Sequence, residues 1–177
     1  MLIKTDRLTI RHIAADDWKS IKEIWMDFNA TALSQYDRPH NTDDEDVRIR
    51  IAKWAAANKG IEHMFFAICL GDAVIGYSAF NKRDDGYEIG YCFHSAYHGK
   101  GYAKESHIAL FDHLRTMGIT GFSAGTAINN TPSVSFLKSL GFTLIDTEKV
   151  SFYKDSEGND IVFDGGIFEL TTKGNSG

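Results

Sequence analysis

The chain has 177 residues, of which 43% are hydrophobic and 12% aromatic, so it can bury one sizeable core. With 24% charged residues and two prolines, the composition excludes a disordered or fibrous chain. The formal net charge of −5 and the lack of a basic stripe argue against nucleic acid as the partner. Cys69 and Cys92 lie inside apolar runs, which excludes a disulfide framework or a zinc site, and no apolar run is long enough for a membrane span. We therefore expect a cytoplasmic protein.

The N-terminal third predicts one strand followed by two helices. Residues 5–13 (TDRLTIRHI) alternate between apolar and polar side chains, which predicts a half-buried strand. Apolar residues then recur at spacings of three and four over 16–29, as on one face of a helix. An irregular segment follows, after which Thr42 and Glu45 form a capping box that predicts a second helix over 42–58.

The rest of the chain predicts an antiparallel meander and then helices that alternate with strands. We expect strands at 64–70, 74–80 and 87–93, a helix at 103–118, a strand at 122–127, a helix at 131–140, and a final hairpin at 142–152 and 161–170. This order favours a mixed sheet flanked by helices over a fully parallel doubly wound one. We expect an α+β fold in one domain over residues 1–172, followed by a loose tail at 173–177.

A glycine-containing turn stands between the third meander strand and the next helix. In the run YCFHSAYHGKGYA, residues 91–103, Gly99 and Gly101 let backbone N–H groups approach an anion, and the following helix adds its own unpaired N–H groups. A diphosphate fits such a turn, and a plain tight turn is the alternative interpretation. Neither the Gly-x-x-x-x-Gly-Lys-Ser/Thr nor the Gly-x-Gly-x-x-Gly phosphate motif is present.

Three segments of the chain carry a family resemblance. They are the central run GYEIGYCFHSAYHGKGYAKES, the first-strand run TDRLTIR and the later run NNTPSVSFLKSLGF. Together they resemble the motifs of the GNAT superfamily of acetyltransferases, in its ribosomal-protein N-acetyltransferase-like (RimJ/RimL) branch. Their order and spacing, with the expected elements, cover nearly the whole chain.

The resemblance implies a mostly antiparallel, seven-stranded sheet flanked by four helices and splayed between strands four and five. Acetyl-CoA would lie in that opening as the cosubstrate, without a metal. Its diphosphate would bind backbone N–H groups of the turn, and Ser95 stands where the family commonly has Pro. The residues implied for the diphosphate are His98, Gly99, Lys100, Gly101, Tyr102 and Ala103.

The resemblance also implies roles for residues around the acetyl group. Glu88 stands where the family has the glutamate that takes the proton of the amine, often through water. The N–H of Cys92 or Phe93 would face the thioester oxygen if the strand bulges as in the family. Asn130 matches the asparagine that holds the pantetheine or acetyl arm, and an N-cap role stays open beside it.

The catalytic acid is where the chain departs from the family. Many relatives have a Tyr in the helix after strand five, but Leu137 stands at the matching position. Ser133 or Ser135 could protonate the leaving thiolate instead, directly or through water. Because a free thiol has a pKa near 8.5, a dedicated acid could also be dispensable.

The acceptor is expected to be an amine, held by the loop after the first helix and by the last hairpin. The residues implied are Tyr36, Arg38 and Tyr153. A protein N-terminus, a polyamine and an aminoglycoside-like amine stay open, as does a homodimer. The alternatives from other classes are a catalytically inactive CoA-binding regulatory module on the same fold and a nucleotide-dependent kinase or ligase.

Overall fold

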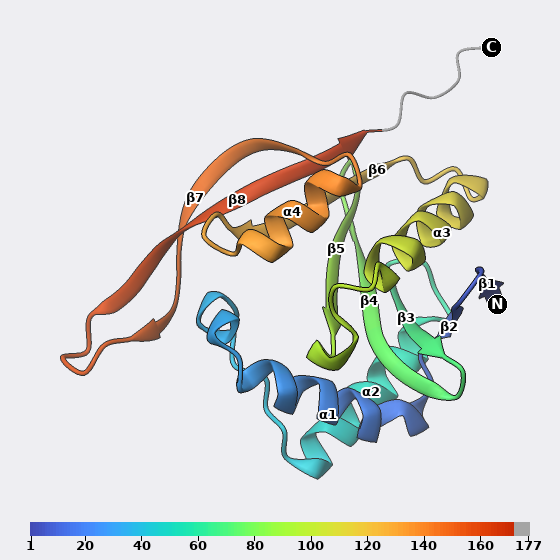
Figure 1. Ribbon diagram of the computed structural model, residues 1–177, viewed down its shortest axis with the longest axis horizontal. Coiled ribbons are helices and arrows are strands. Elements are labelled where there is room, and N and C mark those ends of the chain that lie inside the picture. The colour runs from blue at the N-terminus through green and yellow to red at the C-terminus, as the bar shows by residue number, and fades with distance from the viewer. Residues whose placement is uncertain (172–177) are drawn as a thin grey trace.

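The computed structural model describes residues 1–171, in which eight strands form one sheet in the order β1-β2-β3-β4-β5-β6-β8-β7 (Figure 1). Neighbouring strands pair antiparallel except β5 and β6, which are parallel. No helix within these residues is long and apolar enough to cross a membrane. The elements are β1 (Leu2–Lys4), β2 (Thr9–His12), η1 (Ala15–Asp17), α1 (Trp18–Asn29), η2 (Ala32–Tyr36), α2 (Asp44–Ala57), β3 (His63–Leu70), β4 (Ala73–Arg83), β5 (Gly86–Phe93), η3 (Ser95–Tyr97), α3 (Tyr102–Thr116), β6 (Gly121–Ala127), α4 (Thr131–Ser139), β7 (Thr143–Lys154) and β8 (Asp160–Thr171).

The α+β fold with four helices agrees with the prediction over the described residues, but the sheet has eight strands and not seven. The extra strand, β1, lies before the predicted first strand, whose first residues form a turn instead. The Thr5 N–H donates to the Leu8 carbonyl and the Leu8 N–H donates to the Thr5 hydroxyl, each at 3.0 Å. The chain therefore reverses, and β1 pairs with β2. The predicted tail at 173–177 lies outside the described residues.

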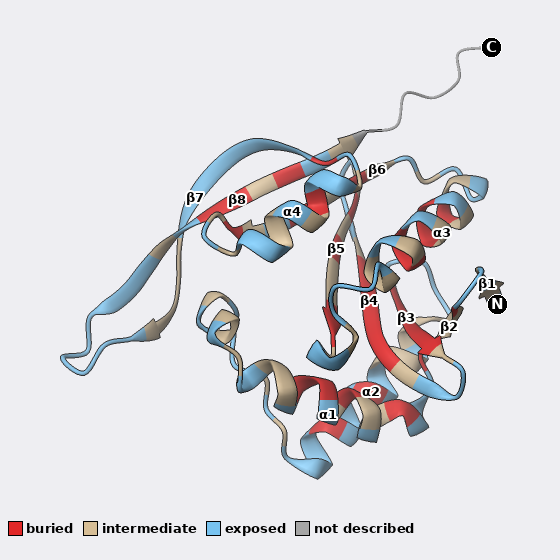
Figure 2. Cartoon of the chain, viewed as in Figure 1, coloured by how far each residue is buried: buried red, intermediate tan, exposed pale blue. Residues whose placement is uncertain are grey.

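Helices cover both faces of the sheet, and two apolar clusters lie beneath them (Figures 1 and 2). α3 and α4 contribute Leu110 and Leu137 to one cluster, together with Ile89 of β5. α1 and α2 contribute Trp25 to the other, which also holds Cys92 of β5. Alternate residues of β5 thus point into opposite layers. The α2 cap is Asp43, whose carboxylate accepts the N–H groups of the two residues after Asp44, so the prediction of Thr42 is wrong by one position.

The sheet opens between its two parallel strands. β5 and β6 pair only at Tyr87 with Phe122 and at Glu88 with Ser123, within the described residues. β6 pairs with β8 along its whole length on its other edge, while β5 continues against β4 alone. The C-terminal half of β5 therefore presents a free backbone edge to the opening. The splay that the family resemblance implies is confirmed.

Candidate active site

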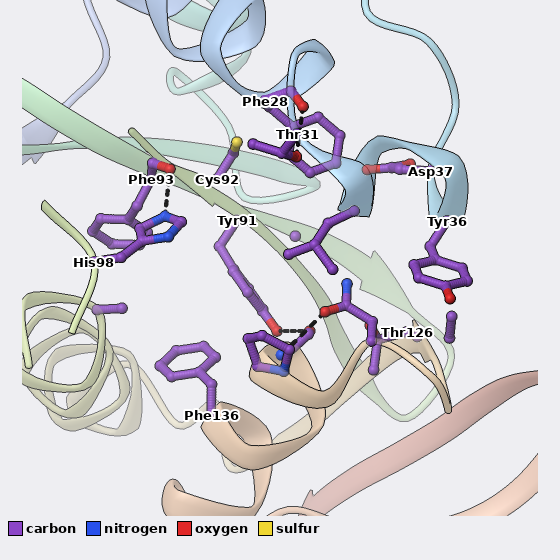
Figure 3. A pocket seen from close by; sticks show the side chains of 18 of the residues that line it. Phe28, Thr31, Tyr36, Asp37, Tyr91, Cys92, Phe93, His98, Thr126 and Phe136 are labelled. Carbon is purple, nitrogen blue, oxygen red and sulfur yellow. Dashed lines mark hydrogen bonds between the residues drawn. The ribbon is translucent and has the colours of Figure 1, made fainter. Parts of the chain in front are cut away.

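A cavity of about 630 Å³ occupies the opening between β5 and β6 (Figure 3). Its lining comes from β5, the glycine turn and the start of α3 on one side, and from β6 and α4 on the other. The end of α1, the η2 loop and the β7/β8 hairpin close the remaining side. Segments far apart in the sequence thus meet at a single site.

The glycine turn brings backbone N–H groups to the wall of the cavity. Gly99 and Gly101 have φ of +72° and +80°, the left-handed region that glycine adopts without a Cβ clash. Gly101 is the N-cap of α3 and no side chain caps the helix there. The first N–H groups of a 15-residue helix are therefore available to an anion, and the helix dipole favours negative charge. The predicted residues of this turn that line the cavity are His98, Gly99, Gly101, Tyr102 and Ala103.

One lysine lies within this turn and another directly follows it, and their side chains point differently. The Lys100 ammonium folds back and donates to the carbonyl of Ala96 at 3.1 Å, and Lys100 is not part of the lining. Lys104, in the first turn of α3, does line the cavity. The side-chain charge available to an anion therefore comes from Lys104, which the sequence did not single out. Lys100 contributes through its backbone position alone.

The free edge of β5 supplies further donors. The His94 N–H donates to the Ile75 carbonyl of β4 at 3.0 Å. Because alternate residues of an antiparallel strand turn their N–H toward the same neighbour, Cys92 also faces β4, while Tyr91 and Phe93 face the opening. The β4–β5 register runs without a shift, so the strand does not bulge and the Cys92 N–H faces β4 rather than the opening. The Phe93 carbonyl already accepts from the His98 ring nitrogen at 2.8 Å. The backbone group of Phe93 that can bond a ligand in the opening is therefore its N–H.

Tyr91 and Ser133 meet across the cavity. Their hydroxyl oxygens lie 2.7 Å apart, one from β5 and one from α4, and Figure 3 shows Tyr91 reaching into the cavity. Burial raises the pKa of Tyr91 to about 12, so the phenol keeps its proton. The Ser133 N–H donates to the Asn130 side chain at 3.3 Å, so Asn130 is the N-cap of α4 and also lines the cavity. Ser135 is exposed and outside the lining.

A match to a protein-family model shows to which family this chain belongs. The acetyltransferase (GNAT) domain matches residues 7–143, which include β5, the glycine turn and α4. The chain belongs to the GNAT acetyltransferase family. It is therefore an enzyme of the acyltransferase class.

Named relatives and solved structures agree with this family. The chain is 31% identical over 146 residues to the N-acetyltransferase YnaD of Bacillus subtilis, covering 80% of this chain and 82% of YnaD. A Salmonella typhimurium acetyltransferase that modifies the N-terminal serine of ribosomal protein L7/L12 superposes with a TM-score of 0.84 at 18% identity, covering 98% of this chain and 100% of that one. RimL in complex with coenzyme A superposes with a TM-score of 0.81 at 19% identity, covering 97% and 98%.

The carboxylates of this GNAT domain are distributed differently from the expectation. Glu88 is half-exposed, accepts from Arg83 Nε at 3.1 Å and is not part of the lining, although it shares a strand face with Gly90, which is. Asp27, Asp37 and Glu148 are the carboxylates that line the cavity. Among residues 1–171, the carboxylate of Glu148 has no hydrogen-bond or ion-pair partner.

Asp27 and Asp37 are already engaged. Asp27 accepts the N–H of Ser95 at 2.8 Å and its hydroxyl at 2.6 Å, which anchors the loop before the glycine turn to α1. A proline at position 95, as the family commonly has, would lack that N–H. Asp37 accepts the N–H of Arg38 at 2.7 Å and lies 4.0 Å from the His40 ring nitrogen. Of the three carboxylates, Glu148 is the one whose side chain has no partner among residues 1–171.

Cys92 contributes its side chain to the lining but not a nucleophile. The thiol is buried, and burial raises its pKa to about 12, so it stays protonated at neutral pH. Within the described residues no group of three or more His, Cys, Asp or Glu side chains could hold a metal ion.

The acceptor side of the cavity joins the η2 loop to the hairpin. Tyr36 lines the cavity and its ring contacts Phe163 edge-on at 5.6 Å. The Tyr153 hydroxyl donates to the Ser34 carbonyl at 3.1 Å, so Tyr153 holds the loop from outside the lining. Arg38 is also outside the lining, with its guanidinium 5.7 Å above the ring of Phe152. Of the three residues predicted for the acceptor, Tyr36 alone reaches the cavity.

Proposed function

We propose that this GNAT enzyme moves an acetyl group from acetyl-CoA to a primary amine by direct transfer in a ternary complex. The observation that supports this function is the opening between β5 and β6. There the start of α3, which no side chain caps, and the free edge of β5 line the same cavity. The first can hold a diphosphate and the second can run beside an extended pantetheine arm. The coenzyme A complex of RimL, a protein of the same fold, supports this cosubstrate.

The residues that would hold acetyl-CoA follow from the lining. The diphosphate would bind N–H groups of residues 98–103, with the Lys104 ammonium as the nearby cation. Asn130, besides capping α4, would hold the pantetheine arm. No part of this arrangement requires a metal ion. The buried thiol of Cys92 argues against an acyl-enzyme, because a protonated thiol is a poor nucleophile.

Acetyl-CoA would supply the activated acetyl group and a thiolate leaving group. The N–H of Phe93 would stabilise negative charge on the acetyl oxygen. Ser133 would donate a hydrogen bond to the departing sulfur, and the Tyr91 hydroxyl 2.7 Å away, which keeps its own proton, would donate to Ser133 in turn. The released thiolate would take its final proton from water. A carboxylate would take the proton that the amine loses.

We assign that carboxylate to Glu148, because it lines the cavity and has no partner in the described residues. Glu88 is the alternative, acting through water from the same face of β5 as Gly90. The ion pair between Glu88 and Arg83 counts against it, since a base must reach the amine directly or through one water.

The acceptor would be a protein N-terminus or a small amine, in keeping with a RimJ/RimL-like enzyme in the cytoplasm. The Salmonella neighbour that modifies an N-terminal serine supports the first of these. Carboxylates and aromatic rings on the acceptor side, Asp37, Glu148, Tyr36 and Phe163, support a cationic amine in general. A polyamine and an aminoglycoside-like amine belong to the same chemical class.

The test is CoA release from acetyl-CoA with a panel of peptides carrying different N-terminal residues, polyamines and aminoglycosides. We expect turnover on at least one amine, with the acetyl group found on that amine by mass spectrometry. Tight CoA binding without turnover on any amine would instead favour the inactive CoA-binding module. Better thermal protection by ATP than by acetyl-CoA would favour a nucleotide-dependent enzyme.

A further inference from the structure

Arg7 contacts the glycine turn without lining the cavity. It lies in the turn between β1 and β2 and is not part of the cavity lining. Its guanidinium donates to the Glu105 carboxylate from Nε at 2.7 Å, with Nη2 2.6 Å from the same oxygen. Its backbone N–H donates to the other carboxylate oxygen at 3.0 Å, and the Thr5 hydroxyl adds a bond there at 2.6 Å. Thr5 and Arg7 therefore bind the first turn of α3 through the Glu105 carboxylate.

The same guanidinium also contacts the turn itself. Arg7 Nη1 donates to the Lys100 carbonyl at 2.9 Å, and the guanidinium lies 4.6 Å above the ring of Tyr102. A Cβ on Gly101 would come within 3.4 Å of Arg7 Nη2. One planar group thus contacts Lys100 in the turn and both Tyr102 and Glu105 in the helix that follows it. Such a rigid fork fixes geometry better than a single-point charge would.

Charge gives Arg7 a second role. Glu105 lies in the first turn of α3, where its negative charge suits the helix dipole but opposes a second anion bound at the same helix end. Arg7 neutralises that carboxylate in place. The N–H groups of the turn can then attract a diphosphate without competition from Glu105.

We propose that Arg7 is a positioning residue for acetyl-CoA, acting through the glycine turn and through Glu105. The inference rests on the proposed binding of the diphosphate at residues 98–103. It predicts that Arg7 affects recognition of the diphosphate and leaves the acetyl-transfer step alone.

The test uses four variants: Arg7→Met, Arg7→Lys, Glu105→Gln and the double variant that combines Arg7→Met with Glu105→Gln. Each is compared with the control variant Arg48→Met. Arg48 is a matched control, because it also pairs with a glutamate and stacks on a ring, with its guanidinium 3.9 Å from Glu45 and 4.9 Å from the ring of Trp18. Calorimetry measures CoA binding, and kinetics compare acetyl-CoA with S-acetyl-pantetheine, which lacks the diphosphate. Circular dichroism melts establish that each variant folds.

For Arg7→Met we expect about tenfold weaker CoA binding and a similar rise in KM for acetyl-CoA, with kcat within about twofold, because one charge-assisted fork is lost. The KM for S-acetyl-pantetheine should not change. Arg7→Lys should give an intermediate loss. The double variant should bind CoA more tightly than Arg7→Met, because it removes the uncompensated carboxylate of Glu105.

Equal binding by Arg7→Met and Arg48→Met would overturn the inference, as would equal rises in KM for both donors. If Arg7→Met does not fold, Arg7→Lys decides by the same readouts: an intermediate loss of CoA affinity supports the inference, and wild-type affinity overturns it. Glu105→Gln should stay within about twofold of wild type, because its amide oxygen still accepts from Arg7. Failure of the wild type to bind CoA would instead count against the proposed function.

Discussion

The hydroxyl groups of Tyr91 and Ser133 lie 2.7 Å apart, on two elements that border the opening of the sheet. We propose that this pair takes the place of the helix tyrosine that the family resemblance implies. Leu137, at the matching position, is fully buried in the core and cannot present a polar group to the cavity. The polar groups at this place are instead the Tyr91 hydroxyl from β5 and the Ser133 hydroxyl from α4.

Removing the Ser133 hydroxyl should slow acetyl transfer. We expect Ser133→Ala to lower kcat by about 100-fold, the lower end of what one donor to a developing negative charge contributes, and Tyr91→Phe to lower it less. Steady-state kinetics measure this, with Ser135→Ala as the control on the same helix. A Ser135→Ala variant as slow as Ser133→Ala would refute the assignment.

Glu148 should matter most where the amine is protonated. At neutral pH we expect Glu148→Gln to lower kcat/KM by about 100-fold, within the range of general-base catalysis, and Glu88→Gln by no more than about threefold. The Glu148→Gln deficit should narrow as the pH approaches the pKa of the amine, because the free amine then needs no base.

The pH profile of kcat/KM for both variants decides between the two carboxylates. Glu62→Gln is a suitable control, since Glu62 is an exposed carboxylate 3.1 Å from Lys82 on the rim of the sheet. The reverse ranking, with Glu88→Gln impaired and Glu148→Gln near wild type, would return the role of base to Glu88.

The parts of the site that could be predicted are those with local causes. Two glycines ahead of a helical pattern define the turn at Gly99 and Gly101, and an Asn-x-x-Ser run defines the cap at Asn130, because both involve neighbours in sequence. Tyr91 could also have been found, since it alternates with Ile89 and Phe93 toward the same face of β5.

The remaining parts depend on contacts between distant segments. Whether Lys100 or Lys104 faces the cavity is set by where the Lys100 side chain finds a carbonyl, which the spacing does not reveal. Alternation along β7 could not predict on which face of the sheet the Glu148 side chain lies, because the β7–β8 register shifts between Leu144 and Asp146. β1 was missed because a three-residue strand forms only through its pairing with β2.

A side chain at Gly99 should weaken acetyl-CoA binding without unfolding the protein. Gly99→Ala places a Cβ at φ of +72° with no atom within 4 Å, so the expected loss of stability is about 1 kcal/mol. Gly118→Ala is a matched control at the other end of α3, because its φ is +81° and its Cβ would also meet open space. Thermal melts should give both variants a similar loss, while calorimetry should show weaker CoA binding for Gly99→Ala alone. A similar affinity for both variants would place the diphosphate elsewhere.

His107 should make the fold sensitive to acid. It is fully buried, with one ring nitrogen 2.8 Å from the carbonyl of Ala103 and the other 3.0 Å from the Ser78 hydroxyl. A carbonyl only accepts, so the first nitrogen donates its N–H to Ala103. In the neutral imidazole the second nitrogen carries no proton and accepts from Ser78. Burial lowers the pKa of His107 to about 4 from an ordinary value of 6.5.

The sign of the pH effect follows from these two values. Between pH 4 and 6.5 the unfolded chain binds a proton at His107 that the folded protein does not, so the free energy of unfolding falls as the pH drops through this window. The loss from this group is on the order of 3 kcal/mol near pH 4 and vanishes above pH 6.5. Urea titrations at pH 4.5 and 7.5 measure it, and the difference between wild type and His107→Gln cancels the contributions of other groups. The pH dependence should be smaller for His107→Gln, and an equal dependence in both proteins would show that His107 is already protonated in the fold.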